Sequence, residues 1–297
     1  METFLGQVFT GLSLASILLL AAVGLTFTFG QMGVINMAHG EFIMAGAYTP
    51  YVLQTGIMAG AFGLAYVVAF PVAFVVAGLM GLVLERTLLA RMTGRALDTL
   101  LVTVGVSLVL QQLARDLFGA PNVEVRAPDW LTGNWTLFGV TMPHTRLFIM
   151  AVAALSIGLV ALFLDRMPDG RRMRAVMQNR DLAAVSGLRT KRVDSKTFFL
   201  GSGLAGIAGV SVALIGQVGS QTGTGYVIDA FLVVIVGGLG KLKGTIIAAL
   251  ALGLLNSFSE YYSSASLGKA IVFIAVIVFL QFRPNGIVSF KSRGLTA

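Results

Sequence analysis

The sequence predicts an all-α, polytopic integral membrane protein, with eight or nine transmembrane helices and glycine-interrupted spans in both halves of one domain, residues 1–297. Two observations carry this prediction. Apolar residues make up 56% of the chain, charged residues only 11%, and the mean hydropathy is +0.87, whereas soluble globular proteins contain about 45–50% apolar and about 25% charged residues. The apolar residues also fall in long runs, and a bilayer core about 30 Å thick needs about 20 helical residues.

The charge-free runs mark the spans in order. Residues 3–40 hold no Asp, Glu, Lys or Arg, and after Glu41 the next charged side chain is Glu85. Such runs form helices because backbone groups in lipid must be hydrogen-bonded internally. Eight or nine helices result when the longest runs are split at glycines and polar clusters; the further runs are residues 99–114, 147–164, 197–228, 245–259 and 270–282.

The positive charges indicate the orientation of these spans. The formal net charge is +8, but 9 of the 21 Lys and Arg residues lie between Arg166 and Lys196, so the charge marks a loop rather than a surface for nucleic acid. Cytoplasmic loops of membrane proteins carry an excess of Lys and Arg. Nine spans with an outside N-terminus place all basic stretches in the cytoplasm and leave residues about 119–145 as an exterior loop. Besides residues 166–196, the basic stretches are Arg86, Arg91 and Arg95, then Lys241 and Lys243, then Arg283, Lys291 and Arg293.

Several kinds of chemistry are excluded by residues that the sequence lacks. It contains no cysteine and only two histidines, which rules out disulfide frameworks, zinc-thiolate sites and cysteine nucleophiles and leaves little for a metal centre. A phosphate-binding loop requires Ser or Thr after its Gly-Lys pair, but Leu242 follows Lys241 and Ala270 follows Lys269. We therefore expect no cofactor, no catalytic residues and no ATPase site in this chain itself.

Two apolar segments carry polar residues that lipid penalises. Asn36, His39 and Glu41 interrupt the first, while Tyr226 and Asp229 lie in the second. An acid at a helix centre costs about 2.5–3.5 kcal/mol on insertion scales, and paired glycine-interrupted segments in two halves of a chain point to a transporter's binding region. The alternatives are that Glu41 lies at the cytoplasmic interface, paired with His39 or a loop arginine, and that Asp229 lies near the outer headgroups.

A third polar set lies on the helix predicted over residues 97–118. Thr103, Ser107 and Gln111 recur every four residues, so they share one face of that helix. This face either lines a polar pathway or hydrogen-bonds to neighbouring helices, which is the common role of Ser, Thr and Gln in membrane spans. The spacing alone leaves both interpretations open.

The basic loop, about residues 165–196, is too patterned for a bare connector. Residues 175–187 are predicted to form a short helix closed by Gly187, with apolar positions beside charged ones. An amphipathic helix between two spans either lies on anionic lipid or docks into another protein. The residues of the loop leave these two uses open.

Several motifs of the sequence resemble those of a known protein family. Asn36-Met37-Ala38-His39-Gly40-Glu41-Phe42 followed by Gly46-Ala47-Tyr48, the loop helix at 179–187, the glycine-rich turn at 237–244 and Arg283-Pro284-Asn285-Gly286 are similar to the permease subunits of branched-chain amino acid type ABC importers. The resemblance covers essentially the whole chain. It implies a bacterial cytoplasmic (inner) membrane protein that works with a second permease subunit, two ATP-binding subunits and an extracytoplasmic substrate-binding protein. It also implies that the loop helix is a coupling helix seated in an ATPase cleft, with Asn179, Arg180, Asp181, Ala184 and Gly187 as its coupling residues.

Four further segments resemble the urea-importer branch of this family. They are residues 97–101, 105–112, 118–123 and 226–231. One departure is Val104, which stands where the urea pattern is expected to carry tryptophan. The narrower resemblance implies that the cargo is urea.

The expected cargo is a small polar solute moving through a protein embedded in membrane lipid. Urea is neutral and planar, with two NH₂ donor groups and one carbonyl acceptor, so carboxylate or carbonyl oxygens and one amide donor satisfy it without a countercharge. A zwitterionic amino acid needs a helix N-terminus for its carboxylate and an acid for its ammonium group. The chain allows both, so a branched-chain amino acid permease is the alternative, and a self-sufficient solute channel is a hypothesis of another class. The pathway is expected to involve Asn36, His39, Glu41, Thr103, Ser107, Gln111, Tyr226 and Asp229.

Overall fold

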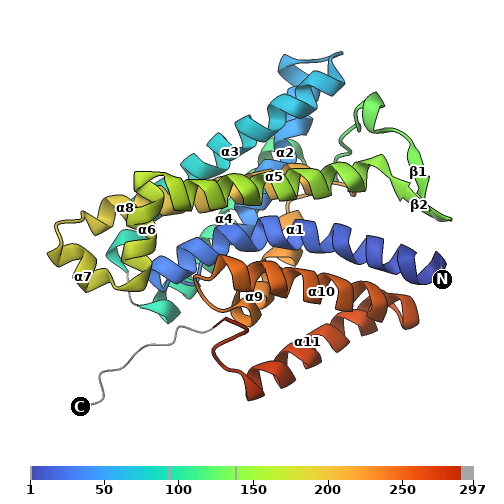
Figure 1. Cartoon of the computed structure of the whole chain (residues 1–297). Helices are drawn as coiled ribbons and strands as arrows, with labels where there is room; N and C mark the ends of the chain where they lie inside the picture. The colour runs from blue at the N-terminus through green and yellow to red at the C-terminus, as the bar shows by residue number, and fades with distance from the viewer. Residues whose placement is uncertain (1, 93–94, 138, 289–297) are drawn as a thin grey trace.

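The computed structural model describes residues 2–92, 95–137 and 139–288, and these are mostly helical (Figure 1). Two short 3-10 turns lie at Leu89–Arg91 and Asp129–Leu131, and a π-helical turn, Leu53–Ile57, extends the second helix. The α-helices in chain order are α1 (Glu2–Met32), α2 (His39–Val52), α3 (Phe62–Thr87), α4 (Ala96–Phe118), α5 (His144–Arg166), α6 (Pro168–Gln178), α7 (Arg180–Val185), α8 (Thr190–Val212), α9 (Thr222–Gly237), α10 (Leu242–Tyr262) and α11 (Ala265–Phe282).

The structure corrects the all-α prediction in one place. Strands β1 (Asn134–Leu137) and β2 (Val140–Pro143) pair as an antiparallel hairpin in the loop between α4 and α5. Trp, Thr and Val favour extended backbone, and Gly139 in the connection has a φ of +79°, a conformation that glycine adopts readily. A short hairpin therefore forms where the sequence predicted only an exterior loop.

Six helices of the described chain are long and apolar enough to cross a membrane. They are α1, α3 with the following 3-10 turn, α4, α5, α10 and α11, and α9 is a shorter apolar helix of 16 residues. The helices α2 and α8 complete the bundle, packing on each other and on α1 and α3. The count of eight or nine spans stays a prediction.

Residues of the predicted basic stretches lie at one end of the bundle, which we call the basic end. Figure 1 shows α6, α7 and the start of α8 there, and the β1–β2 hairpin at the opposite end, which we call the hairpin end. Arg174 of α6 and Lys241 line one cavity, and Gly286 after α11 packs against Gly238. The predicted basic tail residues Lys291 and Arg293 lie outside the described residues.

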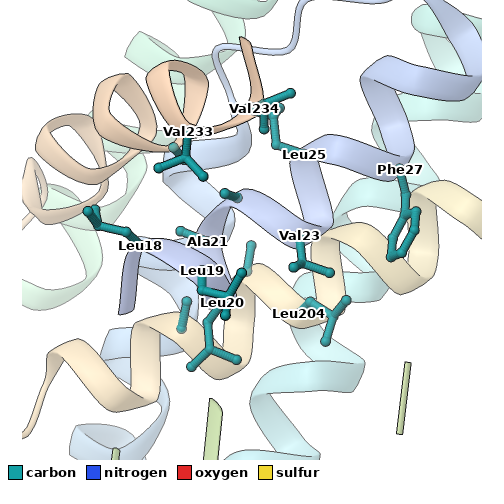
Figure 2. Close-up of a cluster of buried hydrophobic side chains, with 14 of the residues drawn as sticks. Leu18, Leu19, Leu20, Ala21, Val23, Leu25, Phe27, Leu204, Val233 and Val234 are labelled. Carbon is teal, nitrogen blue, oxygen red and sulfur yellow. The ribbon is translucent and has the colours of Figure 1, made fainter. Parts of the chain in front are cut away.

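The core is centred on α1, which is buried over most of its length. Its leucines and valines pack against Leu204 of α8 and against Val233 and Val234 of α9 (Figure 2). Helix α1 also approaches α8 very closely, since a Cβ added to Gly24 would lie 2.1 Å from the carbonyl oxygen of Gly201. Small residues at such crossings let membrane helices pack backbone to backbone, so α1 and α8 form a tight central pair.

The chain leaves helical geometry between α1 and α2. Residues 33–38 are non-helical, beginning at Gly33 with a φ of +63°. His39 Nε2 then lies 3.0 Å from the carbonyl oxygen of Ala21. Ala21 itself lies about 16 Å before the end of α1, at 1.5 Å of helix per residue. The unwound segment, residues 33–38, therefore carries the chain from the basic end toward the middle of the bundle, where α2 begins.

Helices α2 and α9 run from this middle level in opposite directions. Tyr48 of α2 stacks on Phe118 at the end of α4 with 4.2 Å between ring centroids, and Gln54 donates a 2.8 Å hydrogen bond to the carbonyl oxygen of Arg126 in the loop between α4 and α5. Helix α9 instead ends beside the start of α10, where Gly237 packs against Gly244. Each helix thus covers part of the bundle's depth, and their N-terminal turns meet.

Candidate functional site

Glu41 lies at the centre of a hydrogen-bonded cluster between α2, α4 and α9. Its side chain is buried. Ser107 Oγ donates to Glu41 Oε1 over 2.7 Å, and Gln111 Nε2 donates to the same oxygen over 2.9 Å. Gln111 Nε2 also lies 3.2 Å from Thr224 Oγ1 on α9. We call Glu41, Ser107, Gln111 and Thr224 the Glu41 cluster.

Thr103 binds the unwound segment one turn before Ser107 on α4. Its Oγ1 accepts a 3.0 Å hydrogen bond from the backbone N–H of Met37 and lies 3.3 Å from the carbonyl oxygen of Ile35. The face of α4 that carries Thr103 and Ser107 thus holds both the unwound segment and Glu41. Hydrogen bonding of this face to neighbouring segments is therefore observed, and its lining of a polar pathway stays a prediction.

Asn36 and Glu41 carry three polar side-chain atoms that are buried without a hydrogen-bond partner among the described residues. They are both side-chain atoms of Asn36, Nδ2 and Oδ1, and the second carboxylate oxygen of Glu41. A buried polar atom without a partner costs about 1–3 kcal/mol, and native proteins keep few of them. Asn36 and Glu41 therefore retain the capacity to bind a polar solute that reaches them.

The N-terminal turns of α2 and α9 meet beside Glu41. A Cβ added to Gly223 would lie 1.7 Å from the carbonyl oxygen of Gly40, so only glycine permits this contact. Glu41 stands in the first turn of α2 and Thr224 in the first turn of α9. The positive ends of both helix dipoles favour negative charge here, which stabilises the Glu41 carboxylate or an oxygen atom of a bound solute.

His39 faces away from the Glu41 cluster. Its ring bonds to α1 through Ala21, and a Cβ added to Gly24 would lie 3.1 Å from its Cε1 atom. The alternative in which Glu41 pairs with His39 or a loop arginine is not what the structure shows, since the hydrogen-bond partners of Glu41 are Ser107 and Gln111.

Tyr226 and Asp229 lie on another face of α9, toward α10 and α11. They line a cavity of about 290 Å³ together with Asn256, Glu260 and Lys269. Asp229 Oδ2 accepts a 3.2 Å hydrogen bond from Lys269 Nζ. The predicted pathway residues therefore lie in three places. Glu41, Thr103, Ser107 and Gln111 lie on one side of α9, Tyr226 and Asp229 line the second polar cavity, and His39 lies in the core between α1 and α8.

The basic loop forms two helices where the sequence predicted one over residues 175–187. The break falls at Asn179, whose extended backbone ends α6 and whose side chain accepts a 3.0 Å hydrogen bond from Leu182 N–H at the start of α7. Asparagine is a favoured N-cap for this reason. Helix α7 then ends before Gly187, which has a φ of +84°.

Helix α7 presents apolar side chains to the outside. Leu182 is 64% exposed and Val185 83% exposed, while Asp181 and Ala184 are exposed beside them. Arg180 points inward instead, donating hydrogen bonds to both carboxylate oxygens of Asp194 on α8, and these bonds raise the pKa of Arg180. In α6, a hydrogen bond from Lys196 lowers the pKa of Asp169. The loop is thus anchored on one side and open on the other.

Sequence reasoning did not identify Thr224, Lys269 and Asp194 as members of these sites. Thr224 stands two residues before Tyr226 in a glycine-rich stretch, and no spacing pattern marks it. Lys269 begins the last apolar run, so its charge resembles an ordinary helix-end charge. Asp194 lies among four Lys and Arg residues of the segment 189–196, where an acid resembles a solvated loop residue although its side chain is only 3% exposed.

Comparison with known proteins assigns the chain to a family. The family model described as branched-chain amino acid transport system / permease component matches residues 7–280. The chain belongs to this family. It is a permease component and a multi-pass protein of the inner membrane.

Individual members of the family are similar over nearly the whole chain. The high-affinity branched-chain amino acid transport system permease protein LivH of Escherichia coli K12 is 28% identical over 96% of this chain and 95% of its own. The permease protein LivM of the same system and organism is 26% identical over 93% of this chain and 68% of its own. Among solved structures, PsaBC from Streptococcus pneumoniae in complex with Fab covers 96% of this chain and 93% of its own, at 16% identity and a TM-score of 0.45.

Proposed function

We propose that this permease component forms half of the translocation pathway of an ATP-driven importer, and that the Glu41 cluster is where the pathway contacts its cargo. The observation that carries this proposal is the buried Glu41 carboxylate. One of its oxygens accepts hydrogen bonds from Ser107 and Gln111, and the other has no partner among the described residues. A buried, half-satisfied acid in a membrane helix marks a substrate or ion path by default.

The other half of the pathway comes from a second permease subunit. Support for this partner comes from Gln111 and Thr224 of the Glu41 cluster. Both polar side chains are partly open to the outside, where contact with lipid alone would be costly. The two permease proteins LivH and LivM of one E. coli system both match this chain, which supports pairing with a second permease.

ATP hydrolysis is proposed to come from two partner subunits bound at the basic end. The exposed Leu182 and Val185 of α7 are suited to bury apolar surface in a partner cleft, and Asn179, Arg180 and Gly187 hold the helix in place. An extracytoplasmic substrate-binding protein would deliver the cargo at the hairpin end. The basic end then faces the cytoplasm, as the excess of Lys and Arg favours.

Urea is the proposed cargo. Its NH₂ groups can donate to Glu41 Oε2 and to Asn36 Oδ1, and its carbonyl oxygen can accept from Asn36 Nδ2; these three atoms have no partner among the described residues. The hydrogen-bond partners of Glu41 are the neutral side chains of Ser107 and Gln111, and a neutral solute such as urea would bind the carboxylate through hydrogen bonds alone. The resemblance to the urea-importer branch supports the same cargo.

A branched-chain amino acid is the second candidate. The names of the relatives favour it, and the N-terminal turns of α2 and α9 beside Glu41 give a place where a carboxylate is stabilised. An ammonium group would then bind Glu41. Urea is neutral and an amino acid is zwitterionic, so the two cargoes would bind different groups of the same cluster.

Competition in vesicles separates the two cargoes. The complex, reconstituted with ATP inside and its binding protein outside, is given radiolabelled urea together with an excess of unlabelled leucine, and then the reverse. Uptake of urea that leucine leaves unchanged supports urea. If the complex takes up leucine and an excess of urea leaves this uptake unchanged, the cargo is a branched-chain amino acid and the urea proposal is wrong.

A further inference from the structure

A buried chain of hydrogen bonds joins α7 to the end of α1. Arg180 Nη1 and Nη2 donate to Asp194 Oδ1 and Oδ2 over 3.0 Å and 2.5 Å. Gln31 Nε2 of α1 donates to Asp194 Oδ1 over 2.7 Å, and Thr197 Oγ1 of α8 donates to Gln31 Oε1 over 2.7 Å. We call Arg180, Asp194, Gln31 and Thr197 the relay.

Burying the polar side chains of the relay costs free energy. Gln31, Asp194 and Thr197 are all buried, and the Asp194 side chain is only 3% exposed. An apolar core at this position would avoid the desolvation of a carboxylate and an amide, and a buried ion pair adds little stability compared with apolar packing. Each side-chain oxygen of Asp194 and Gln31 accepts a hydrogen bond in the relay, so the contact is specific in geometry.

The relay ends where the unwound segment begins. Gln31 is followed by Met32, the last residue of α1, and then by residues 33–38. Thr103 holds this segment through Met37 N–H and lies on the face of α4 that also holds Glu41. A displacement of Gln31 therefore acts directly on the unwound segment, which Thr103 ties to the face of α4 that holds Glu41.

We propose that Gln31 and Asp194 are positioning residues that transmit movement of α7 to the unwound segment, so that the ATPase cycle reaches the Glu41 cluster through the relay. This inference rests on the proposed docking of ATPase subunits on α7. Asp194 moves with Arg180 because the pair is bidentate, and α1 follows because Gln31 is bonded to Asp194. Coupling between two sites requires an element with two arrangements, and the unwound segment is that element.

A single cysteine reports on the unwound segment, because the natural chain contains none. Ile35→Cys keeps the backbone carbonyl that faces Thr103, and its side chain is partly exposed. The assembled complex is labelled with a water-soluble maleimide without nucleotide and after trapping with ATP and vanadate. We expect the labelling rate to differ about fivefold or more between the two states, which is the lower end of the range of affinity changes found at coupled sites.

The test compares this difference in three backgrounds. Gln31→Met keeps the length of the side chain and removes both relay bonds, and Thr197→Val removes one bond with little change of shape. The matched control is Thr26→Val, which removes a buried hydroxyl of α1 bonded to Thr245 over 2.9 Å outside the relay. We expect Gln31→Met to lose most of the nucleotide-dependent difference while bound ATPase subunits still hydrolyse ATP. Thr197→Val, which leaves the bond between Gln31 and Asp194 in place, should lose a smaller part of the difference, and the control should keep it.

The outcomes separate the relay from the docking proposal. A full difference in both relay variants overturns the inference, and so does equal loss in the relay variants and the control, because that is the signature of general destabilisation. If ATPase subunits do not bind the unsubstituted chain, the docking proposal is wrong. This outcome is seen when the complex is assembled, before any labelling is done.

Discussion

The carboxylate of Glu41 and the amide of Gln111 are joined by a hydrogen bond of 2.9 Å across the contact between α2 and α4. The same amide nitrogen lies 3.2 Å from Thr224 on α9. Gln111 is thus the point where three helices meet in one polar contact. Any change in the relative position of these helices alters the hydrogen bonds that Glu41 can offer to a solute.

Replacing Glu41 by Gln is expected to abolish most transport. The substitution keeps the shape and removes the charge, and hydrogen bonds to a charged group contribute about 1.5–3 kcal/mol, where about 1.4 kcal/mol corresponds to a tenfold change. Initial uptake rates, normalised to the amount of complex in the membrane, should fall about tenfold or more. Asp116→Asn on α4 is the matched control, since this exposed carboxylate bonds to Gln112; equal loss in both variants would contradict the assignment.

The ion pair of Asp229 with Lys269 allows a separate test of the second cavity. If Asp229 lines the pathway, Asp229→Asn lowers uptake at normal membrane abundance. Lys269→Gln breaks the same 3.2 Å contact without altering the acid, so it reports on the pair alone. We expect Asp229→Asn to be the more harmful change. Wild-type uptake in Asp229→Asn removes this residue from the pathway and leaves the Glu41 cluster unaffected.

The exposed apolar side chains of α7 are expected to hold the ATPase subunits. Fully burying a leucine or valine side chain contributes about 1.5–3 kcal/mol, so Leu182→Ala combined with Val185→Ala should weaken co-purification of these subunits about tenfold or more. Leu137→Ala is the control, because Leu137 is 54% exposed on the hairpin at the opposite end. Unchanged co-purification in the α7 variant would refute docking through this face.

Close packing of α2 on α9 predicts a stability difference between two glycines of one helix. Gly223→Ala places a Cβ 1.7 Å from the Gly40 carbonyl oxygen, whereas a Cβ on Gly225 meets no atom within 4 Å. Overpacking costs about 1–3 kcal/mol, so Gly223→Ala should lower the unfolding temperature in detergent and Gly225→Ala should not. Similar temperatures for both variants would show that the helices separate freely.

The individual polar residues of the site are predictable from sequence, but their grouping is not. Glu41 stands out because an acid in an apolar segment is costly, and Ser107 and Gln111 stand out through four-residue spacing. Which face of α9 meets α4 depends on the contact of Gly40 with Gly223, 183 positions apart in the numbering, and no local pattern encodes it. The same holds for Gln31 and Asp194, and for the break at Asn179, where one capping bond decides between one helix and two.

Solute accumulation by purified components tests the central claim most directly. Vesicles containing the complex of this chain with a second permease and two ATPase subunits are compared with vesicles containing this chain alone, each supplied with radiolabelled urea and binding protein outside. We expect accumulation above the outside concentration only in the complex with ATP inside. Rapid equilibration of urea across vesicles that hold this chain alone, without ATP, would contradict an ATP-driven importer and identify a channel.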